Sequence, residues 1–90
     1  MAKVHVDPAE LKKFARELGR FNEELQGLTG ALRGRMTQLS HTWNDQEQRK
    51  FEEEFSRTLK MLGRFADVSQ QHIAFLMRKA QHLENYQQQR

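Results

Sequence analysis

The sequence predicts an all-α fold, an antiparallel two-helix hairpin that dimerises into a four-helix bundle. Two long series of apolar residues recur at helical spacing, and one turn-forming segment separates them near the middle of the 90-residue chain. Strand-forming residues are scarce, because the chain contains only three Val and one Ile. At this length we expect a single helical-hairpin domain over residues 1–90.

The first helix is expected over about residues 8–40. Asp7 can cap this helix, Pro8 suits its first position, and Glu10 can complete a capping box. Large apolar residues then recur at alternating steps of three and four, with one extra residue before Met36. They form one narrow stripe, which we expect the second helix to bury without further help. The stripe consists of Leu11, Phe14, Leu18, Phe21, Leu25, Leu28, Leu32, Met36, Leu39 and Trp43.

The turn is expected at about residues 41–45, where Asn, Asp and Thr favour turns over helix. Asp45 followed three residues later by Gln48 indicates a second capping box. The second helix should therefore occupy about residues 46–86, followed by a frayed tail at 87–90. Because the link is short, the two helices should run antiparallel.

The second helix carries a wider apolar surface than the first. Beside its main apolar row runs a second row of Met61, Val68 and Phe75, spaced by seven residues. One helix cannot cover both rows, so we expect a dimer in which another hairpin covers the remaining surface. The residues expected at the dimer interface are Phe51, Phe55, Met61, Leu62, Val68 and Phe75.

Composition and spacing argue against an enzyme. The chain has no Cys, which excludes disulfides, thiolate metal sites and cysteine nucleophiles. His72 and His82 are ten residues apart, too far for one metal ion on a helix. Ser40 and His41 are sequence neighbours at a helix end, and Glu52–Glu54 form one exposed run. We therefore predict no catalytic residue, no metal and no cofactor.

The distribution of charge and hydropathy bears on partners and location. The net charge is +3, and basic and acidic residues are interspersed without the basic patch that nucleic-acid binding needs. No apolar run approaches the roughly 18 residues of a membrane span. The N-terminal residues lack the apolar region of a signal peptide. If the protein leaves the cell, it must therefore use a route that reads a folded or C-terminal signal.

The middle and the end of the chain carry a recognisable layout. Trp43 falls in the short mid-chain turn, and Leu39 precedes it by four residues. Phe51 follows Trp43 by eight residues, Phe55 comes four later, and Tyr86 lies near the end. In this layout and in overall length the chain resembles the WXG100 family, small helical hairpins that are substrates and partners of bacterial type VII secretion.

Two features depart from the family pattern. The family has Gly two residues after Trp, whereas this chain reads Trp43-Asn44-Asp45. Tyr86 occupies the place of the Tyr in the family's C-terminal Y-x-x-x-acid signal, but the fourth residue after it is the basic Arg90. Either an acidic group needed for recognition comes from a partner chain, or the chain belongs to a divergent branch that is not secreted.

The resemblance implies a homodimer, or a heterodimer with a related WXG-type hairpin, and no enzymatic activity. It also implies a protein that is secreted without a cleaved signal peptide, or is otherwise cytoplasmic. A membrane-bound FtsK-type secretion ATPase is a further partner that the resemblance implies. Recognition would fall to Trp43, Asn44, Asp45 and Tyr86. Trp43 has a second interpretation as the last core residue of the first helix. Two other functions remain open, a structural coiled-coil adaptor and a small basic nucleic-acid-binding protein.

Overall fold

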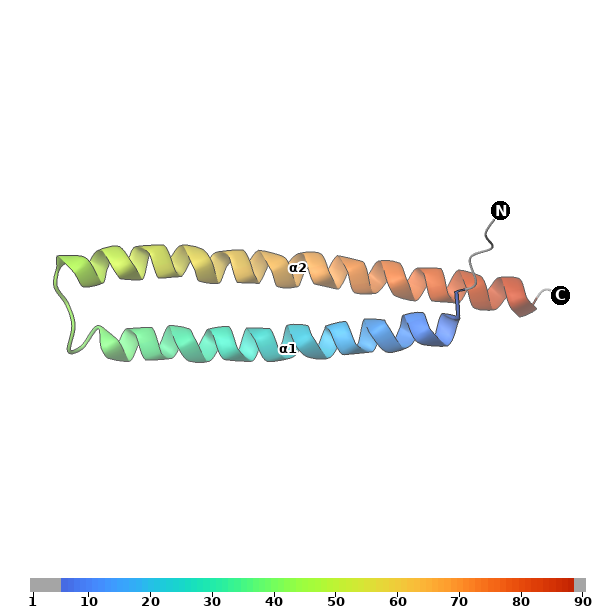
Figure 1. Cartoon of the computed structure of the whole chain (residues 1–90), viewed down its shortest axis with the longest axis horizontal. Coiled ribbons are helices and arrows are strands. Elements are labelled where there is room, and N and C mark those ends of the chain that lie inside the picture. Colours follow the sequence, from blue (N-terminus) through green and yellow to red (C-terminus); the bar gives the residue numbers. More distant parts are fainter. Residues whose placement is uncertain (1–5, 89–90) are drawn as a thin grey trace. The chain divides into compact units, whose positions relative to one another are not determined.

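The computed structural model describes residues 6–88, which form two α-helices joined by a short link. Helix α1 spans Pro8–Leu39 and helix α2 spans Gln46–Gln88, with no strand among the residues described (Figure 1). The predicted all-α hairpin is confirmed. The expected frayed tail is wrong at residues 87 and 88, which continue α2 because Gln is a good helix former. Arg90 lies outside the described residues.

Both helices begin at the predicted caps. The Asp7 carboxylate accepts a hydrogen bond from the backbone N–H of Ala9 at 2.9 Å. The Asp45 carboxylate accepts one from the backbone N–H of Gln48 at 2.8 Å, which confirms Asp45 as the cap. The Gln48 side chain donates to Glu52, so it does not complete the expected capping box. Each carboxylate satisfies an N–H group that has no partner within its own helix.

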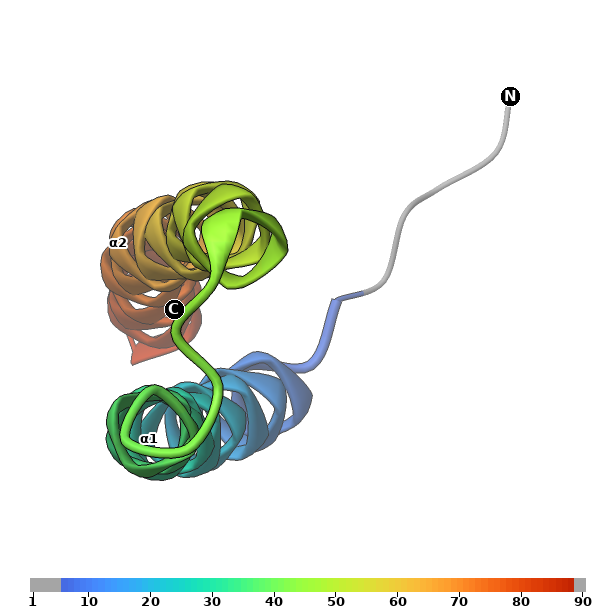
Figure 2. The same cartoon turned by 90° about the vertical axis from the view of Figure 1, so that its left-hand side faces the viewer.

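The link is a tight turn at the end of α1. The backbone N–H of Trp43 donates to the carbonyl of Leu39 at 2.9 Å, and the Ser40 hydroxyl donates to the carbonyl of Thr37 at 2.6 Å. These bonds satisfy carbonyl groups that the helix itself leaves unpaired. Figure 2, seen from the side of the link, shows the chain crossing here from α1 to α2.

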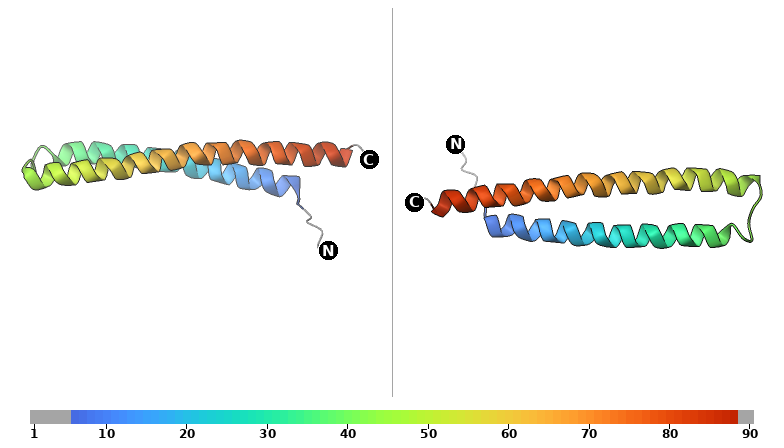
Figure 3. Two further views of the ribbon diagram at one scale, coloured as in Figure 1. Left: turned by 90° about the horizontal axis from the view of Figure 1, so that it is seen from above. Right: turned by 180° about the vertical axis from the view of Figure 1, so that it is seen from behind.

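Contacts between the helices form two units. The terminal unit contains α1 up to Asn22 and α2 from Val68 onward. The turn unit contains residues 23–67, which comprise the rest of α1, the link and the first half of α2. Within each unit the two helical segments run antiparallel (Figure 3), since a short link returns the chain in the opposite direction.

Small side chains fill the centre of the terminal unit. Ala15 and Ala80 are buried, and Leu residues beside them are half-buried. A Cβ atom added to Gly19 would lie 3.8 Å from Cδ1 of Ile73, an ordinary van der Waals contact, so Gly19 lies beside α2 with room for a methyl group. Asn22 is only 1% exposed, and neither atom of its amide group has a hydrogen-bond partner.

Larger side chains fill the turn unit. Met36 from α1 and Leu59 from α2 are buried, and Phe55 and Leu62 are half-buried. The unit also buries the polar side chain of Gln48, which lies in the first turn of α2. The core of this unit therefore extends up to the link.

The expectation that α2 alone buries the apolar stripe of α1 is wrong. Phe14 is 56% exposed and Leu28 is 65% exposed. The reason is that the residues of α1 that face α2 are partly small or polar, and a pattern built on large apolar residues passes over them. They recur every seven residues as Pro8, Ala15, Asn22, Thr29 and Met36.

Candidate partner-binding surface

The exposed apolar side chains of the terminal unit share one position relative to the core. Phe14 directly precedes the buried Ala15 on α1. Val68 and Phe75 on α2 each directly precede a side chain that faces α1. Successive residues of an α-helix are about 100° apart around its axis. These exposed side chains therefore lie on the flank of each helix, beside the contact between helices.

An ion pair shows which flank this is. Lys12 follows the inward Leu11, and Glu84 follows the inward Leu83. The Lys12 Nζ atom lies 2.7 Å from Glu84 Oε2, so residues that follow inward positions meet on one side of the terminal unit. Residues that precede inward positions must then share the opposite side. The apolar face of the terminal unit, on that side, consists of Phe14, Phe21, Val68 and Phe75.

The turn unit has exposed apolar residues at the same kind of position. Leu28 precedes the inward Thr29, and Met61 precedes the inward Leu62. The apolar face of the turn unit consists of Leu28, Phe51, Met61 and Phe65, each of them exposed. Large apolar residues that cluster on a surface indicate binding to another protein.

Aromatic side chains gather at the link end of the turn unit. The ring of Trp43 packs on that of Phe51 with centroids 5.9 Å apart, and Phe51 stacks on Phe55 at 5.6 Å. Beside them lies an open apolar groove of about 190 Å³. The groove is lined by Leu32, Arg35, Met36, Leu39, Phe51 and Phe55. Trp43 is half-buried, so part of the indole remains accessible.

Hydrogen bonds hold the link beside this aromatic cluster. The Gln48 side chain donates to Oε2 of Glu52 at 2.9 Å, while its backbone N–H bonds the Asp45 carboxylate. The Arg49 guanidinium donates to the carbonyl of Asn44 at 3.5 Å, the outer limit for a hydrogen bond. Asp45 and Asn44 therefore fix the backbone next to Trp43 and do not themselves form a pocket.

The residues expected at a dimer interface divide into two groups. Phe51, Met61, Val68 and Phe75 are exposed on the apolar faces, whereas Phe55 and Leu62 are half-buried against α1. Tyr86 is 71% exposed on α2 in the terminal unit, and Trp43 belongs to the turn unit. The two expected recognition residues therefore belong to different units.

Sequence reasoning missed the contribution of α1 to these faces. Phe14 and Leu28 were expected inside the hairpin, and the structure exposes both. One signal could have revealed them. A seven-residue repeat counted from Pro8, the first helical residue, passes through Ala15 and Thr29, one position after each exposed residue. That repeat predicts the contact with α2 only if small and polar residues are allowed to face the other helix.

Residues 6–88 contain no group of three or more His, Cys, Asp or Glu side chains that could hold a metal ion. His41, His72 and His82 are all exposed. Neither helix, as far as it is described, has a stretch apolar and long enough to span a membrane.

Comparison with known proteins places the chain in a family. The model of WXG100, described as proteins of 100 residues with WXG, matches residues 3–88. No curated protein matches the chain. The wild-type secreted protein EsxB from Bacillus anthracis is 25% identical, with a TM-score of 0.84 over 94% of this chain and 99% of that one. Its selenomethionine-labelled form is 24% identical, with a TM-score of 0.83 over 97% and 99%. The chain belongs to the WXG100 family.

Proposed function

We propose that this chain is a substrate of a bacterial type VII secretion system, or the co-secreted partner of one, and that it acts by binding another helical hairpin. As a WXG100 protein it is a small helical protein associated with type VII secretion. Members of this family form dimers with related hairpins and leave the cell without a signal peptide. What we propose for this chain in particular is which of its surfaces bind the partner hairpin and which are recognised by the secretion apparatus.

The exposed apolar faces are the observation that carries the proposal. Phe75 is 58% exposed and Phe14 is similarly accessible, although both are large apolar side chains. Leu28 and Met61 are exposed in the turn unit. Fully burying one such side chain stabilises a complex by about 1.5–3 kcal/mol. A partner hairpin that covers these faces therefore supplies burial that the two helices alone do not achieve.

Recognition by the secretion apparatus is proposed for Trp43 and Tyr86. The Tyr86 side chain is free to contact another protein, since most of its surface is exposed. The Trp43 ring is braced by Phe51 and still presents part of its surface. A membrane-bound FtsK-type ATPase is the proposed receptor. If Trp43 were a fully buried core residue, no part of its ring would be accessible to this receptor.

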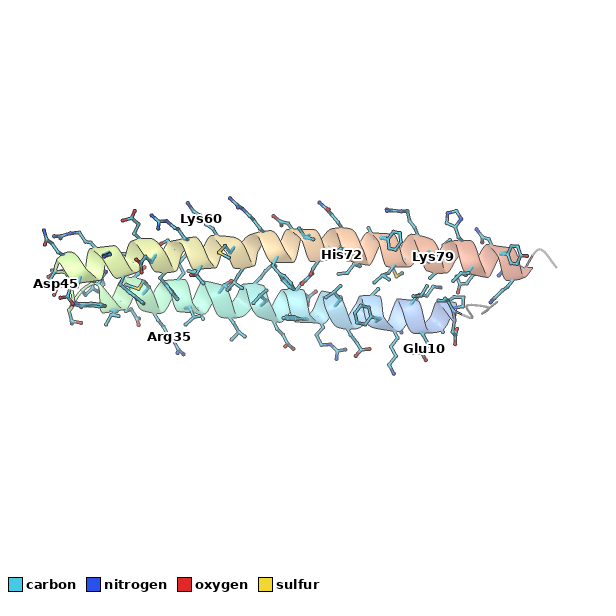
Figure 4. The ribbon with its side chains drawn as sticks, turned by 45° about the horizontal axis from the view of Figure 1, so that its top comes forward. Glu10, Arg35, Asp45, Lys60, His72 and Lys79 are labelled. Atoms are coloured by element: carbon cyan, nitrogen blue, oxygen red, sulfur yellow. The ribbon has the colours of Figure 1, made fainter. Side chains whose placement is uncertain are left out.

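Export is tested in a bacterium that carries a type VII system and its substrates. The tagged chain should accumulate in the culture medium, and deletion of the FtsK-type ATPase should abolish its export. Trp43→Ala and Tyr86→Ala should each reduce export, while Lys60→Ala, an exposed substitution on α2, should not. Figure 4 shows Lys60 pointing away from α1, which makes it a suitable control.

Two results would count against this function. The wild-type chain could stay inside cells that export other substrates, as a coiled-coil adaptor would. It could also reach the medium equally well without the ATPase. Trp43 and Tyr86 lie outside the buried core, so both Ala variants should keep the helicity of the wild type. Circular dichroism checks this, and reduced export at unchanged helicity then indicates a recognition defect and not unfolding.

A further inference from the structure

Tyr86 lies in the last described turn of α2, where the contact with α1 ends. Leu83 and Glu84 are half-buried, and residues 85–88 after them are all exposed. No hydrogen bond or ion pair joins residues 85–88 to the described part of α1. This end of α2 runs past the first residues of α1 (Figure 1 and Figure 3). Tyr86 is therefore presented on a helical turn that α1 does not hold directly.

The helical shape of this turn depends on the turn before it. In an α-helix each backbone N–H bonds to the carbonyl four residues earlier, so the N–H groups of residues 86–88 need the carbonyls of residues 82–84. Helix ends open easily when few contacts hold them. The Gln81 side chain donates to Asn85 at 3.0 Å, but this exposed bond stays within α2. Order at Tyr86 therefore depends on what holds residues 82–84 in place.

An ion pair with α1 holds this segment. The Lys12 ammonium group donates to both carboxylate oxygens of Glu84, at 2.8 Å and 2.7 Å. It is the only ion pair between the helices among residues 6–88, because the other pair, Arg57–Glu53, lies within α2. The Lys12–Glu84 pair thus ties α2 to α1 two residues before Tyr86.

The charge of Glu84 makes this tie more important. Glu84 is one of the last five described residues of α2, and the last turn of the helix contains no basic residue. The C-terminal end of a helix carries a partial negative charge, so a carboxylate there opposes the helix dipole. Lys12 supplies the compensating positive charge from α1. Loss of Lys12 would therefore remove the tie and also leave an unfavourable charge near the end of α2.

The ion pair and Tyr86 lie on different sides of α2. Tyr86 follows Glu84 by two residues, which places it about 200° further around the helix axis. It follows Phe75 by eleven residues, so it lies within about 20° of the direction of Phe75, on the side of the apolar face. Tyr86 is 71% exposed. The ion pair can therefore fix this turn without covering the side chain that the turn presents.

We infer that Lys12 and Glu84 are positioning residues for Tyr86. Their ion pair keeps the last described turn of α2 helical, so that the Tyr86 ring is held in one direction for the secretion apparatus. This inference rests on the proposed role of Tyr86 in recognition. A turn that is already ordered binds more tightly than a frayed one, because less conformational entropy is lost on binding. The pair should then affect export without contacting the receptor.

The first test measures amide hydrogen exchange by NMR on the purified full chain. Lys12→Glu places two carboxylates together and should speed exchange at Tyr86 and Gln87 by about 2- to 5-fold, as expected for loss of a partly exposed ion pair. The swapped chain, Lys12→Glu with Glu84→Lys, should regain the wild-type rate, because it restores the pair and suits the helix dipole. Lys13→Glu is the matched control, since Lys13 is exposed and belongs to neither ion pair.

Export of the tagged chain is the second readout. Lys12→Glu should reduce export by about 2-fold or more, while the swapped chain and Lys13→Glu should be exported like the wild type. Leu59→Val shows whether a loss of stability alone has the same effect, because it shortens a buried side chain of the turn unit. It should lower the midpoint of urea unfolding and leave both export and exchange at Tyr86 unchanged.

The outcomes separate this inference from the proposed function. Unchanged exchange at Tyr86 in Lys12→Glu would overturn the inference, and so would normal export of this variant despite faster exchange. An equal loss of export in Leu59→Val would also overturn it, since stability alone would then explain the defect. All three results leave the proposed function standing when Tyr86→Ala is poorly exported. Normal export of Tyr86→Ala, or no export of the wild type, would overturn the proposed role of Tyr86 and this inference with it.

Discussion

The Lys12 ammonium group lies 2.8 Å and 2.7 Å from the two carboxylate oxygens of Glu84, joining the start of α1 to the end of α2. Both side chains are about two-thirds covered, with 30% and 33% of their surface exposed. The pair lies on the polar side of the terminal unit, opposite Phe14 and Phe75. One side of this unit thus carries an intramolecular ion pair, and the opposite side exposes large apolar side chains.

This ion pair should contribute measurably to stability. A double-mutant cycle of Lys12→Ala and Glu84→Ala should give a coupling free energy of about 0.5–1 kcal/mol, near the top of the range for exposed pairs because two hydrogen bonds form. Urea unfolding measures it at one fixed protein concentration, since association also affects stability. The coupling should decrease at high salt, and a coupling of zero at low salt would contradict the prediction.

Asn22 should be a destabilising residue. Its amide is buried without a hydrogen-bond partner, and such a group costs about 1–3 kcal/mol. Asn22→Leu, of similar size, should therefore raise the midpoint of urea unfolding. Asn85→Leu is the matched control, because Asn85 is exposed and accepts a hydrogen bond from Gln81. A lower midpoint for Asn22→Leu would show that the amide finds partners in solution.

Residues with strong local signals were predictable from the sequence. Asp7 and Asp45 cap their helices as expected, because capping depends only on neighbouring backbone groups. The turn at Trp43 was predictable for the same reason.

The helix contact was less accessible to sequence reasoning. Ala15, Asn22 and Ser69 are buried between the helices, yet none is a large apolar residue. The exposed Phe14 lies one residue from the buried Ala15, so an error of one position in the predicted contact exchanges a buried residue for one on the exposed apolar face. Only the packing of α1 on α2 decides which of the two positions is buried.

Substitutions on the apolar face should weaken association and leave the hairpin folded. Phe75→Gln should raise the Kd for the partner by about 10-fold or more, because burying a Phe side chain contributes about 1.5–3 kcal/mol. Met77→Gln is the matched control, since Met77 is also exposed but follows the inward Leu76 and so lies on the polar side. Light scattering measures association and circular dichroism measures helicity. If the two substitutions raised the Kd equally, association would not depend on the apolar face more than on the polar side.

Asp45 occupies the place of the family's glycine. Its role as a helix cap can be measured separately from any role in recognition. Asp45→Ala should lower the free energy of unfolding by about 1 kcal/mol, because the backbone N–H of Gln48 loses its acceptor. Asp45→Gly should cost only a few tenths, since glycine is tolerated at a helix cap. Urea unfolding of both variants gives the comparison.

The same two variants also tell whether residue 45 serves recognition as well as capping. If Asp45 only fixes the start of α2 beside Trp43, Asp45→Gly should be exported as well as the wild type, and export of Asp45→Ala should fall no more than its stability requires. Changed export of Asp45→Gly at unchanged helicity would instead assign the carboxylate a direct contact with the secretion apparatus. The two outcomes differ because Asp45 is exposed, so its side chain is accessible as well as bonded to Gln48.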